Sequence, residues 1–195
     1  MTEQLVERAR RGDGDAFVAL IEEPEPAMTR IATAILREPA DVADALQETL
    51  VALWRELPRL RSSDAWPAWS ERVLVNACRL VLRRRGRRRV REIALTGARD
   101  RDSDAIGLPG VSFDENVAER DAFDRAFETL DGDARTILIL HHLEGRSVTA
   151  IAATFGIATG TAKSRLFTAR RRLEAALAAG DRTLDAAGRL ADDRS

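Results

Sequence analysis

The sequence predicts an all-α protein with two small helical domains joined by a flexible linker, the C-terminal one containing a helix-turn-helix. Apolar residues recur at steps of three and four along nearly the whole chain, without convincing strand alternation. The chain has 195 residues, 45% hydrophobic but only 5% aromatic, and it contains no tyrosine. This length suits one or two domains, and a polar stretch over residues 92–116 separates two helical halves.

The composition limits the classes of function that the chain can have. Basic and acidic residues nearly balance, 31 against 32, which gives a net charge of −1. A general polyanion binder is therefore excluded, and any nucleic-acid binding must come from local basic patches. The single cysteine, Cys78, cannot form an internal disulfide or a metal cluster, so we expect it to be a small buried residue.

The sequence indicates no metal site, no cofactor and no membrane segment. His141 and His142 are adjacent on a predicted helix, so their side chains point about 100° apart and do not share a metal. The N-terminal residues lack a signal-peptide pattern, and no apolar run reaches the length of a membrane span. We expect a cytoplasmic protein with no membrane insertion.

The first domain is predicted over residues 1–91 and begins with three short helices. A cluster of glycine and aspartate separates the first two, and Pro24 ends the second. Pro26 suits the first turn of the third, because a proline there loses no hydrogen bond. These helices are predicted over residues 3–11, 16–23 and 26–37.

The fourth predicted helix, over residues 40–57, is amphipathic. Its leucines and valine follow steps of four, four, three and four, which place them on one helical face. These residues are Val42, Leu46, Leu50, Leu53 and Leu57. The polar face carries Asp41, Asp44, Gln47, Glu48 and Arg55. The pattern predicts one packed face and one face in solvent.

A fifth helix starts near Trp66 and leads into a dense group of arginines, residues 79–91, here named the arginine run. It contains eight arginines and no acidic residue. Self-repulsion destabilises such a segment unless a polyanion, or water and salt, compensates the field. The arginine run is therefore either a nucleic-acid contact or a solvated helix end that continues into a loop. We expect Gly86 to fray this helix.

Residues 92–116 are rich in Gly, Asp, Ser and Pro, and six acidic residues stand against two arginines. A mobile acidic linker is predicted there. The second domain follows over residues 117–180, and the polar tail, residues 181–195, is expected to be frayed or disordered, with a partner-binding site as the alternative. The helices of the second domain are predicted over residues 114–129, 131–143, 147–155 and 159–177.

Residues 147–166 have the pattern of a helix-turn-helix. Ser147 can cap the first helix, Gly156 can adopt the left-handed conformation that ends it, and Thr159 can cap the second. Ile157 fills the turn. The inward-facing residues are Val148, Ile151, Ala152 and Phe155 in the first helix and Ala162, Leu166, Ala169, Leu173 and Leu177 in the second.

The outward face of the second helix carries hydroxyls and cations. Such side chains suit entry into a DNA major groove, where arginine contacts guanine edges and Ser, Thr and Lys hold phosphates. The alternative is an ordinary helical hairpin with a charged outer face. The residues are Thr161, Lys163, Ser164, Arg165, Thr168, Arg171 and Arg172.

Four stretches together resemble a bacterial RNA polymerase sigma factor of the extracytoplasmic-function (ECF, group IV) family. Residues 41–55, with an acidic start, a Gln-Glu pair and an aromatic-Arg end, resemble its polymerase-binding helix. Residues 66–85 resemble its promoter-melting helix. Residues 130–138 resemble the opening of its second DNA-binding domain, and residues 160–173 resemble its recognition helix. The stretches occur in the family's order and cover nearly the whole chain except the tail.

The resemblance implies a non-enzymatic factor that binds core RNA polymerase and promoter DNA and is controlled by an anti-sigma factor. Region 2 would occupy residues 1–91 and region 4 residues 117–180, with a linker that leads toward the RNA path. Recognition of the −35 element is assigned to Thr161, Lys163, Ser164, Arg165, Thr168 and Arg171. Recognition and melting of the −10 element are assigned to Leu60, Arg61, Ser62, Ser63, Asp64, Trp66, Asn76, Arg83 and Arg84. Polymerase binding is assigned to Asp41, Asp44, Gln47, Glu48, Leu50 and Trp54.

Two tryptophans and two departures from the family pattern bear on these expectations. Trp66 and Trp69 can stack on unpaired bases; packing in the core is the alternative, and it is expected more for Trp69.

Pro24 and Pro26 interrupt a stretch that is usually continuous helix in relatives. Glu71 stands where relatives often carry an aromatic or apolar residue, which predicts weaker melting or a different −10 preference.

A stand-alone helix-turn-helix regulator with an N-terminal sensing domain is the competing hypothesis. It leaves the helix over residues 40–57 and the tryptophan-arginine helix without a role, and it predicts operator binding without polymerase. Co-purification with polymerase distinguishes the two. An enzyme is not indicated, because no Gly-rich phosphate loop, metal-ligand cluster or nucleophile-base arrangement occurs in the sequence.

Overall fold

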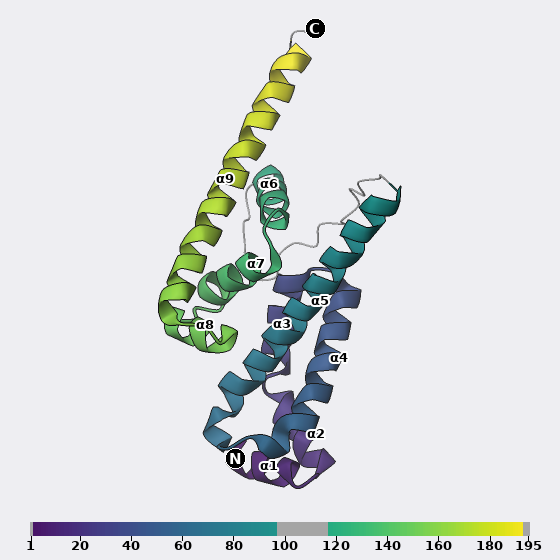
Figure 1. Ribbon diagram of the computed structural model, residues 1–195, viewed down its shortest axis with the longest axis vertical. Coiled ribbons are helices and arrows are strands. Elements are labelled where there is room, and N and C mark those ends of the chain that lie inside the picture. Colours follow the sequence, from purple (N-terminus) through teal and green to yellow (C-terminus); the bar gives the residue numbers. More distant parts are fainter. Residues whose placement is uncertain (1, 97–116, 193–195) are drawn as a thin grey trace.

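The computed structural model describes the backbone of residues 2–96 and 117–192, and the side chains of residues 2–87 and 120–180. Every secondary-structure element in these ranges is helical (Figure 1), so the prediction of an all-α protein is confirmed. No helix within the described ranges has the length and apolar character needed to cross a membrane.

The N-terminal half packs three longer helices side by side, and two short helices cover one end of this group (Figure 1). Two short 3-10 turns lead from the fourth helix into the fifth. The elements are α1 (Thr2–Arg10), α2 (Gly14–Glu22), α3 (Glu25–Leu36), α4 (Pro39–Glu56), η1 (Leu57–Arg59), η2 (Ser63–Ala65) and α5 (Trp66–Thr96).

The C-terminal half lies against α3 and α5, and its last helix extends well beyond the rest of the molecule (Figure 1). A π-helical turn, η3, continues the second helix of this half. The elements are α6 (Val117–Glu128), α7 (Gly132–Leu138), η3 (Ile139–Leu143), α8 (Val148–Phe155) and α9 (Thr159–Asp192).

Local signals set the corners between the first helices. The carboxylate of Asp13 accepts a hydrogen bond from the Ala16 amide at 3.0 Å and caps α2. Pro24 occupies the N-cap position of α3 and Pro26 its first turn, so α2 and α3 are separate helices, as the two prolines predicted. Arg37 ends α3 in a backbone conformation with φ of 67°.

One connected apolar core runs through both halves. Leu53 and Leu74 of the N-terminal half, and Ile137 and Leu140 of the C-terminal half, are almost fully buried within it. Side-chain burial of this kind is the main stabilising contribution to a helical fold. The two halves are therefore packed together rather than merely tethered.

The prediction that α5 frays at Gly86 is wrong. The helix continues through Gly86 and the arginine run to Thr96. One glycine costs a helix only about 1 kcal/mol relative to alanine, and the surrounding arginines favour helix. The first residues of the segment expected as a linker, 92–116, are consequently helical, and residues 97–116 lie outside the described part.

The C-terminal tail also differs from the expectation. Helix α9 continues past Gly180 to Asp192, where a frayed or disordered tail was predicted. The segment after Gly180 contains several alanines, leucines and arginines, which have high helix propensity and extend a helix already nucleated over residues 159–177. Residues 193–195 lie outside the described part.

The packed face of α4 is rotated from the predicted one. Val42, Leu53 and Leu57 are buried as expected, but Leu50 is 38% exposed. Thr49 is buried in the core instead. Its hydroxyl donates a hydrogen bond to the Ala45 carbonyl at 2.7 Å, so the buried polar group has a partner.

Candidate functional site

The helix-turn-helix has the geometry that the sequence predicted. The Ala150 amide donates to Ser147 Oγ at 3.2 Å, which caps α8. Gly156 ends α8 in the left-handed conformation, with φ of 65° and ψ of 37°. The Ile157 amide then donates to the Ala152 carbonyl at 3.0 Å and closes the turn. One detail was wrong: Ala158, not Thr159, is the N-cap of α9, because its carbonyl accepts the first helical bond, from Ala162.

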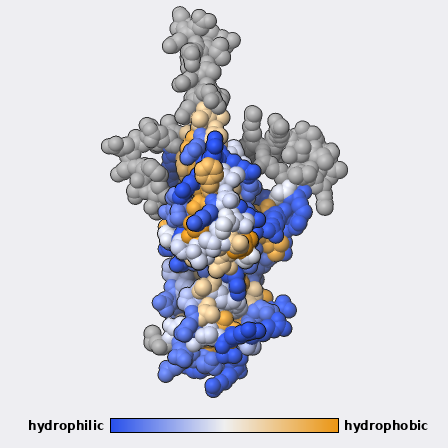
Figure 2. Space-filling view, turned by 60° about the vertical axis from the view of Figure 1, so that its left-hand side comes forward, coloured by the Kyte–Doolittle hydropathy of each residue, from blue (hydrophilic) through white to orange (hydrophobic). Residues whose placement is uncertain are grey.

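The residues predicted to read DNA all lie on the exposed side of α9. Ala162, Leu166 and Ala169 are buried against the rest of the domain, so the positions between them face solvent. The exposed side includes Thr161, Lys163, Ser164, Arg165, Thr168 and Arg171. Figure 2 brings this side of the molecule forward, and hydrophilic and hydrophobic groups are mixed on it.

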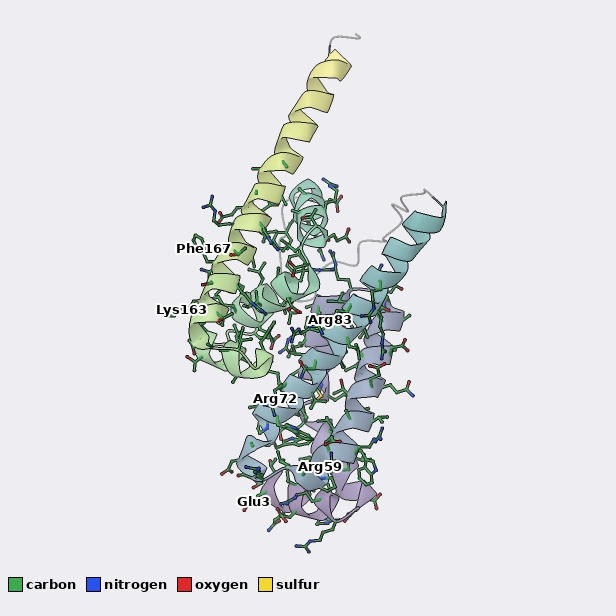
Figure 3. The ribbon with its side chains drawn as sticks, viewed as in Figure 1. Glu3, Arg59, Arg72, Arg83, Lys163 and Phe167 are labelled. Atoms are coloured by element: carbon green, nitrogen blue, oxygen red, sulfur yellow. The ribbon has the colours of Figure 1, made fainter. Side chains whose placement is uncertain are left out.

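One apolar residue, Phe167, also lies on this face and was not predicted to belong to it. Phe167 is 62% exposed, and its ring lies 6.0 Å from the guanidinium carbon of Arg171. Figure 3 shows Lys163 and Phe167 together on the outer side of α9. The available signal was its position directly after Leu166, one step off the buried stripe. A large apolar side chain in that place can contact a thymine methyl group.

The outer face of α4 forms a second candidate surface. Asp44, Gln47 and Glu48 line a shallow pocket together with Val51, Ala52 and Arg55. Leu50, Val51 and Trp54 are 38%, 49% and 39% exposed, so apolar and acidic groups occur together. The Trp54 ring packs edge-on against Phe17 of α2, with centroids 5.1 Å apart, which fixes its orientation. Val51 was not predicted to belong to this surface.

The turn between α4 and α5 presents polar groups over an apolar floor. Arg61, Ser62 and Asp64 are exposed, whereas Leu60 and Trp66 are 7% and 3% exposed. The expected order of the tryptophans is wrong, because Trp66 is the buried one and Trp69 is partly exposed. Their rings are 5.7 Å apart and tilted. Trp66 therefore belongs to the core beneath the turn, and Trp69 packs against that core while keeping part of its surface in solvent.

Asn76 and Arg83 are exposed further along α5. The carboxamide oxygen of Asn76 accepts a long hydrogen bond from Arg79, at 3.5 Å. The predicted −10 residues therefore form a row along one end of the molecule and the length of α5 rather than a single pocket.

Acidic side chains from other helices compensate the arginine run. Arg84 pairs with Glu48, and Arg85 approaches Asp41 at 3.4 Å, both acids being on α4. Arg79 makes a two-pronged contact with Asp133 of α7. The repulsion inferred from the sequence is thus partly relieved within the chain, and two predicted polymerase-binding acids take part in that relief.

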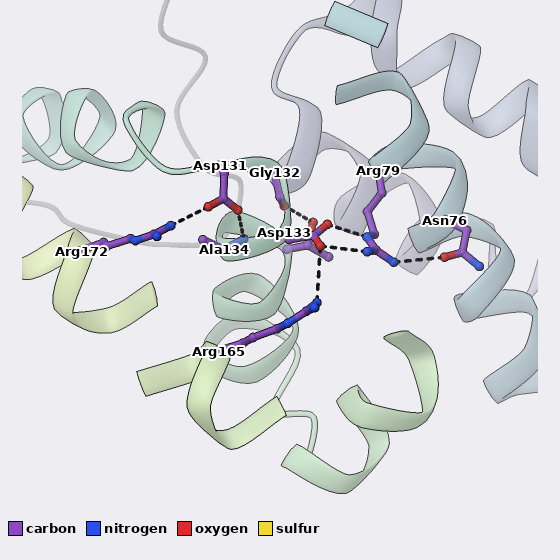
Figure 4. A network of polar contacts seen from close by, with 9 residues as sticks. Asn76, Arg79, Asp131, Gly132, Asp133, Ala134, Arg165 and Arg172 are labelled. Atoms are coloured by element: carbon purple, nitrogen blue, oxygen red, sulfur yellow. Dashed lines mark hydrogen bonds and ion pairs between the residues drawn. The ribbon is translucent and has the colours of Figure 1, made fainter. Parts of the chain in front are cut away.

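Asp133 contacts arginines from two other helices, Arg79 of α5 and Arg165 of α9 (Figure 4). Partial burial by itself would raise the pKa of Asp133, but hydrogen bonds from Arg79 and the charges of Arg79, Arg83 and Arg165 outweigh it and lower that pKa below the usual value. Its carboxylate is therefore ionised at neutral pH. Beside it, Asp131 caps α7 and pairs with Arg172 at 2.7 Å.

Glu71, the second departure from the family pattern, faces the C-terminal half. Burial raises the pKa of Glu71, and its pairing with Arg146 opposes that rise. The residue therefore contacts the other domain, and its carboxylate is only slightly accessible to solvent.

Two helical modules, one with a basic helix beside a polar turn and one with a helix-turn-helix, define a promoter-binding class of protein. Residues 20–88 match the family model "Sigma-70 region 2", and residues 120–173 match "Sigma-70, region 4". The chain belongs to the ECF sigma factors. It is a non-enzymatic factor with a region 2, responsible for core binding and −10 recognition, and a region 4, whose helix-turn-helix recognises −35.

Curated relatives support this placement over most of the chain. The ECF RNA polymerase sigma-E factor of Haemophilus influenzae is 32% identical over 182 residues, which cover 89% of this chain and 94% of the relative. The RNA polymerase sigma-H factor of Pseudomonas aeruginosa is 29% identical over 180 residues, which cover 90% and 93%.

Two solved structures share the fold. The sigma factor RpoE of Bartonella quintana, in complex with the anti-sigma factor NepR, is 27% identical, with a TM-score of 0.61 over 83% of this chain and 96% of that one. CnrH, in complex with the cytosolic domain of CnrY, is 23% identical, with a TM-score of 0.60 over 92% and 99%.

Proposed function

We propose that this sigma factor divides promoter recognition among three surfaces: the outer face of α9, the α4–α5 turn with α5, and the outer face of α4. The observation that carries the proposal is the sorting of side chains on α9. Ala162, Leu166 and Ala169 of its apolar stripe are buried, while every candidate DNA-reading side chain on this helix is exposed. A helix sorted in this way has one face for its own domain and one for a major groove.

The −35 element would be read as duplex by α9. Arg165 and Lys163 supply cations near the N-terminal end of the helix, where recognition helices enter the groove. Thr161, Ser164 and Thr168 supply short hydroxyls for phosphates and base edges. Arg171, one turn later, would hold the backbone. Their roles in −35 recognition are assigned from their position on α9 and their exposure. Discrimination between promoters with the correct and an altered −35 sequence tests these roles.

The −10 element would be held by the polar turn Arg61–Asp64 and by α5. An unpaired base that leaves the duplex needs hydrogen-bonding groups for its edge and an apolar surface for its ring. The turn supplies the first, with Leu60 and Trp66 as its floor, and Trp69 can supply the second. Asn76 and the exposed arginines Arg83 and Arg84 would follow the strand along α5.

Core polymerase would bind the outer face of α4. Leu50, Val51 and Trp54 give it an exposed apolar centre, and the acids around the pocket give it a charged rim. This combination of an aromatic anchor with polar surroundings is typical of protein–protein interfaces. Region 2 would extend over residues 1–91 and region 4 over residues 117–180, separated by a linker over 92–116.

An anti-sigma factor is the expected regulator, acting in the cytoplasm where polymerase is found. One similar solved structure is a complex of a sigma factor with the anti-sigma factor NepR, and another is CnrH in complex with the cytosolic domain of CnrY. We propose that an inhibitor of this chain covers the apolar centre of α4, because covering it excludes polymerase.

Run-off transcription with core polymerase on a library of genomic fragments tests the function. The purified chain should direct initiation at defined start sites that share two upstream elements, and mapping the starts yields both elements. Absence of defined starts, together with specific DNA binding by the chain alone, would instead favour the stand-alone regulator. Retention of polymerase on the immobilised chain separates the two hypotheses independently.

A further inference from the structure

Helix α9 has two flanks, one on each side of its exposed face, and they have different partners. Arg165 lies on one flank, 3.5 Å from the Asp133 carboxylate. Arg170, five residues further along, lies about 140° around the helix from Arg165, because each residue turns an α-helix by about 100°. A recognition helix lies between the two sugar-phosphate backbones that border a major groove. Each flank of α9 therefore faces one backbone when the helix reads a duplex.

The flank of Arg170 has a histidine where the other flank has carboxylates. The Nε atom of Arg170 lies 3.1 Å from Nε2 of His142, which belongs to the π-helical turn η3, and both side chains are exposed. Within the side chains that the structure describes, Arg170 makes no ion pair, not even with Glu174 one turn further along α9, whereas Arg165 and Arg172 both pair with acids. The charge of Arg170 therefore remains available to an anion.

Hydrogen bonds assign the ring protons of the two adjacent histidines. The Arg146 carbonyl oxygen only accepts, so His141 Nδ1 donates to it at 3.0 Å. The Nε atom of Arg170 only donates, so Nε2 of His142 is the accepting, unprotonated nitrogen. His142 is therefore neutral in this arrangement. A second proton on its ring would place two N–H groups and two positive charges against each other.

The surroundings of His142 favour this neutral form. Partial desolvation of the ring, the charge of Arg170 and the neighbouring His141 lower the pKa of His142 below its usual value. The nearest acid along the chain, Glu144, is held by Arg30 of α3 through two hydrogen bonds of 2.9 Å. An anion between Arg170 and His142 would reverse the balance, because it attracts both cations and accepts a hydrogen bond from each.

We propose that Arg170 and His142 form a phosphate-binding site for the promoter backbone that borders the −35 element, and that His142 takes up a proton from solvent at Nε2 when the phosphate binds. The inference rests on the proposed function, since it uses the duplex that α9 reads. The phosphate replaces the hydrogen bond between the two side chains, and each of them donates to a phosphate oxygen. A phosphate carries no sequence information, so this site adds equal affinity for promoters with and without the natural −35 sequence.

Proton uptake makes promoter binding depend on pH. The complex holds one proton more than the separate protein and DNA, at any pH between the lowered pKa of His142 in the free chain and its higher pKa beside a phosphate. The affinity therefore rises as the pH falls through this range, by at most about tenfold per pH unit.

Two substitutions of His142 separate its charge from its hydrogen bond. His142→Gln retains an acceptor for Arg170 but cannot become charged, and His142→Lys supplies a permanent charge. The matched control is His141→Gln, which makes the same substitution in the only other histidine of the sequence. All three positions of substitution lie outside the base-reading set on α9.

The experiment measures binding of polymerase holoenzyme to a fluorescent promoter fragment over a series of salt concentrations, at about pH 6 and about pH 8. Relative to wild type, His142→Gln should have a logarithmic salt slope shallower by about 0.9 at the lower pH, for one phosphate no longer neutralised, and the same slope at the higher pH. His142→Lys should keep the steeper slope at both pH values. His141→Gln should match wild type throughout.

Equal slopes for wild type and His142→Gln at the lower pH would overturn the inference. A decrease in slope that is the same at both pH values would also overturn it, because it would show distortion of α9 rather than loss of a titrating charge. A lower unfolding temperature with unchanged slopes would assign a purely structural role to the Arg170–His142 hydrogen bond.

Run-off transcription with wild type is measured in parallel, and its failure would reject the proposed function. The same slope comparison, made with DNA that the chain binds without polymerase, then still decides whether the phosphate site exists.

Discussion

Arg165 is the single residue with the most direct test. Its guanidinium lies 3.5 Å from the Asp133 carboxylate in this structure, and we propose that it contacts a base edge in the complex with promoter DNA. Replacement of Arg165 by alanine should weaken −35 recognition by roughly 1–3 kcal/mol if the residue reads a base. The measurement is binding of polymerase holoenzyme to promoters with and without the natural −35 sequence.

Arg170→Ala is the matched control for this substitution. Arg170 is exposed on the same helix, but its Nε lies 3.1 Å from His142 Nε2 and it is not in the predicted recognition set. Unchanged discrimination between the two promoters after Arg165→Ala would remove Arg165 from that set.

Cys78 is fully buried within the core, and burial raises the pKa of its thiol to about 12. The thiol is therefore protonated throughout the neutral range, and the reactive thiolate forms only near that pKa or after unfolding. We expect a maleimide or disulfide reagent to modify the native protein far more slowly than the denatured protein at pH 8. Fast labelling of the native chain would contradict the packing of α5.

Among the structural elements, the arginine run contains both exposed arginines and arginines that pair with acidic residues of α4, namely Arg84 with Glu48 and Arg85 with Asp41. Substitution of Arg83, Arg84 and Arg85 together by alanine should flatten the salt dependence of promoter binding by about 0.9 in logarithmic slope for each phosphate that the variant no longer neutralises. Arg83 alone should account for the largest single change, because Arg84 and Arg85 exchange one carboxylate partner for a phosphate.

The control for the arginine run is Arg59→Ala, which removes an exposed arginine that pairs with Glu56 outside the predicted DNA surface. Its salt slope should equal that of wild type. An unchanged slope in the triple variant would show that the arginine run does not contact phosphates.

The outer face of α4 is the second element with a direct test. Val51→Glu introduces a charge at the apolar centre of the predicted polymerase surface and should weaken core binding at least about tenfold, since buried unpaired charge is costly at an interface. Val18→Glu, at a 60% exposed position of α2, is the matched apolar-to-acid control. Affinity for core polymerase is measured with labelled sigma factor, and an equal decrease in both variants would argue against a localised interface.

For the whole molecule, the continuous core predicts cooperative unfolding. The two regions share apolar contacts and the nearly buried Arg37–Asp124 pair, so wild type should unfold in a single calorimetric transition. A Cβ atom at Gly132 would lie 2.7 Å from Leu82 Cδ1, so Gly132→Gln should weaken the contact between α7 and α5 and broaden or divide this transition, while Gly14→Gln, where an added Cβ meets nothing within 4 Å, should not. Two transitions in wild type would show that the regions are stable independently.

Structure that depends on neighbours in the chain could be predicted from the sequence. Helix positions, the Ser147 cap and the Gly156 turn all follow from periodicity and from residues at most a few positions apart. Structure that depends on distant segments could not be predicted in this way. The Arg79–Asp133 contact joins positions 54 residues apart, and no pattern along the chain indicates it. The exposure of Leu50 and the burial of Trp66 were missed for the same reason, because neighbouring helices select the packed face.

One carboxylate that holds arginines from both DNA-binding regions has a consequence for the order of events at a promoter. Asp133 and Arg165 belong to region 4 and Arg79 to region 2, so separation of the regions removes this carboxylate from Arg79 while Arg165 keeps it. Arg79 would therefore become available to DNA first, and DNA itself would have to displace Asp133 from Arg165.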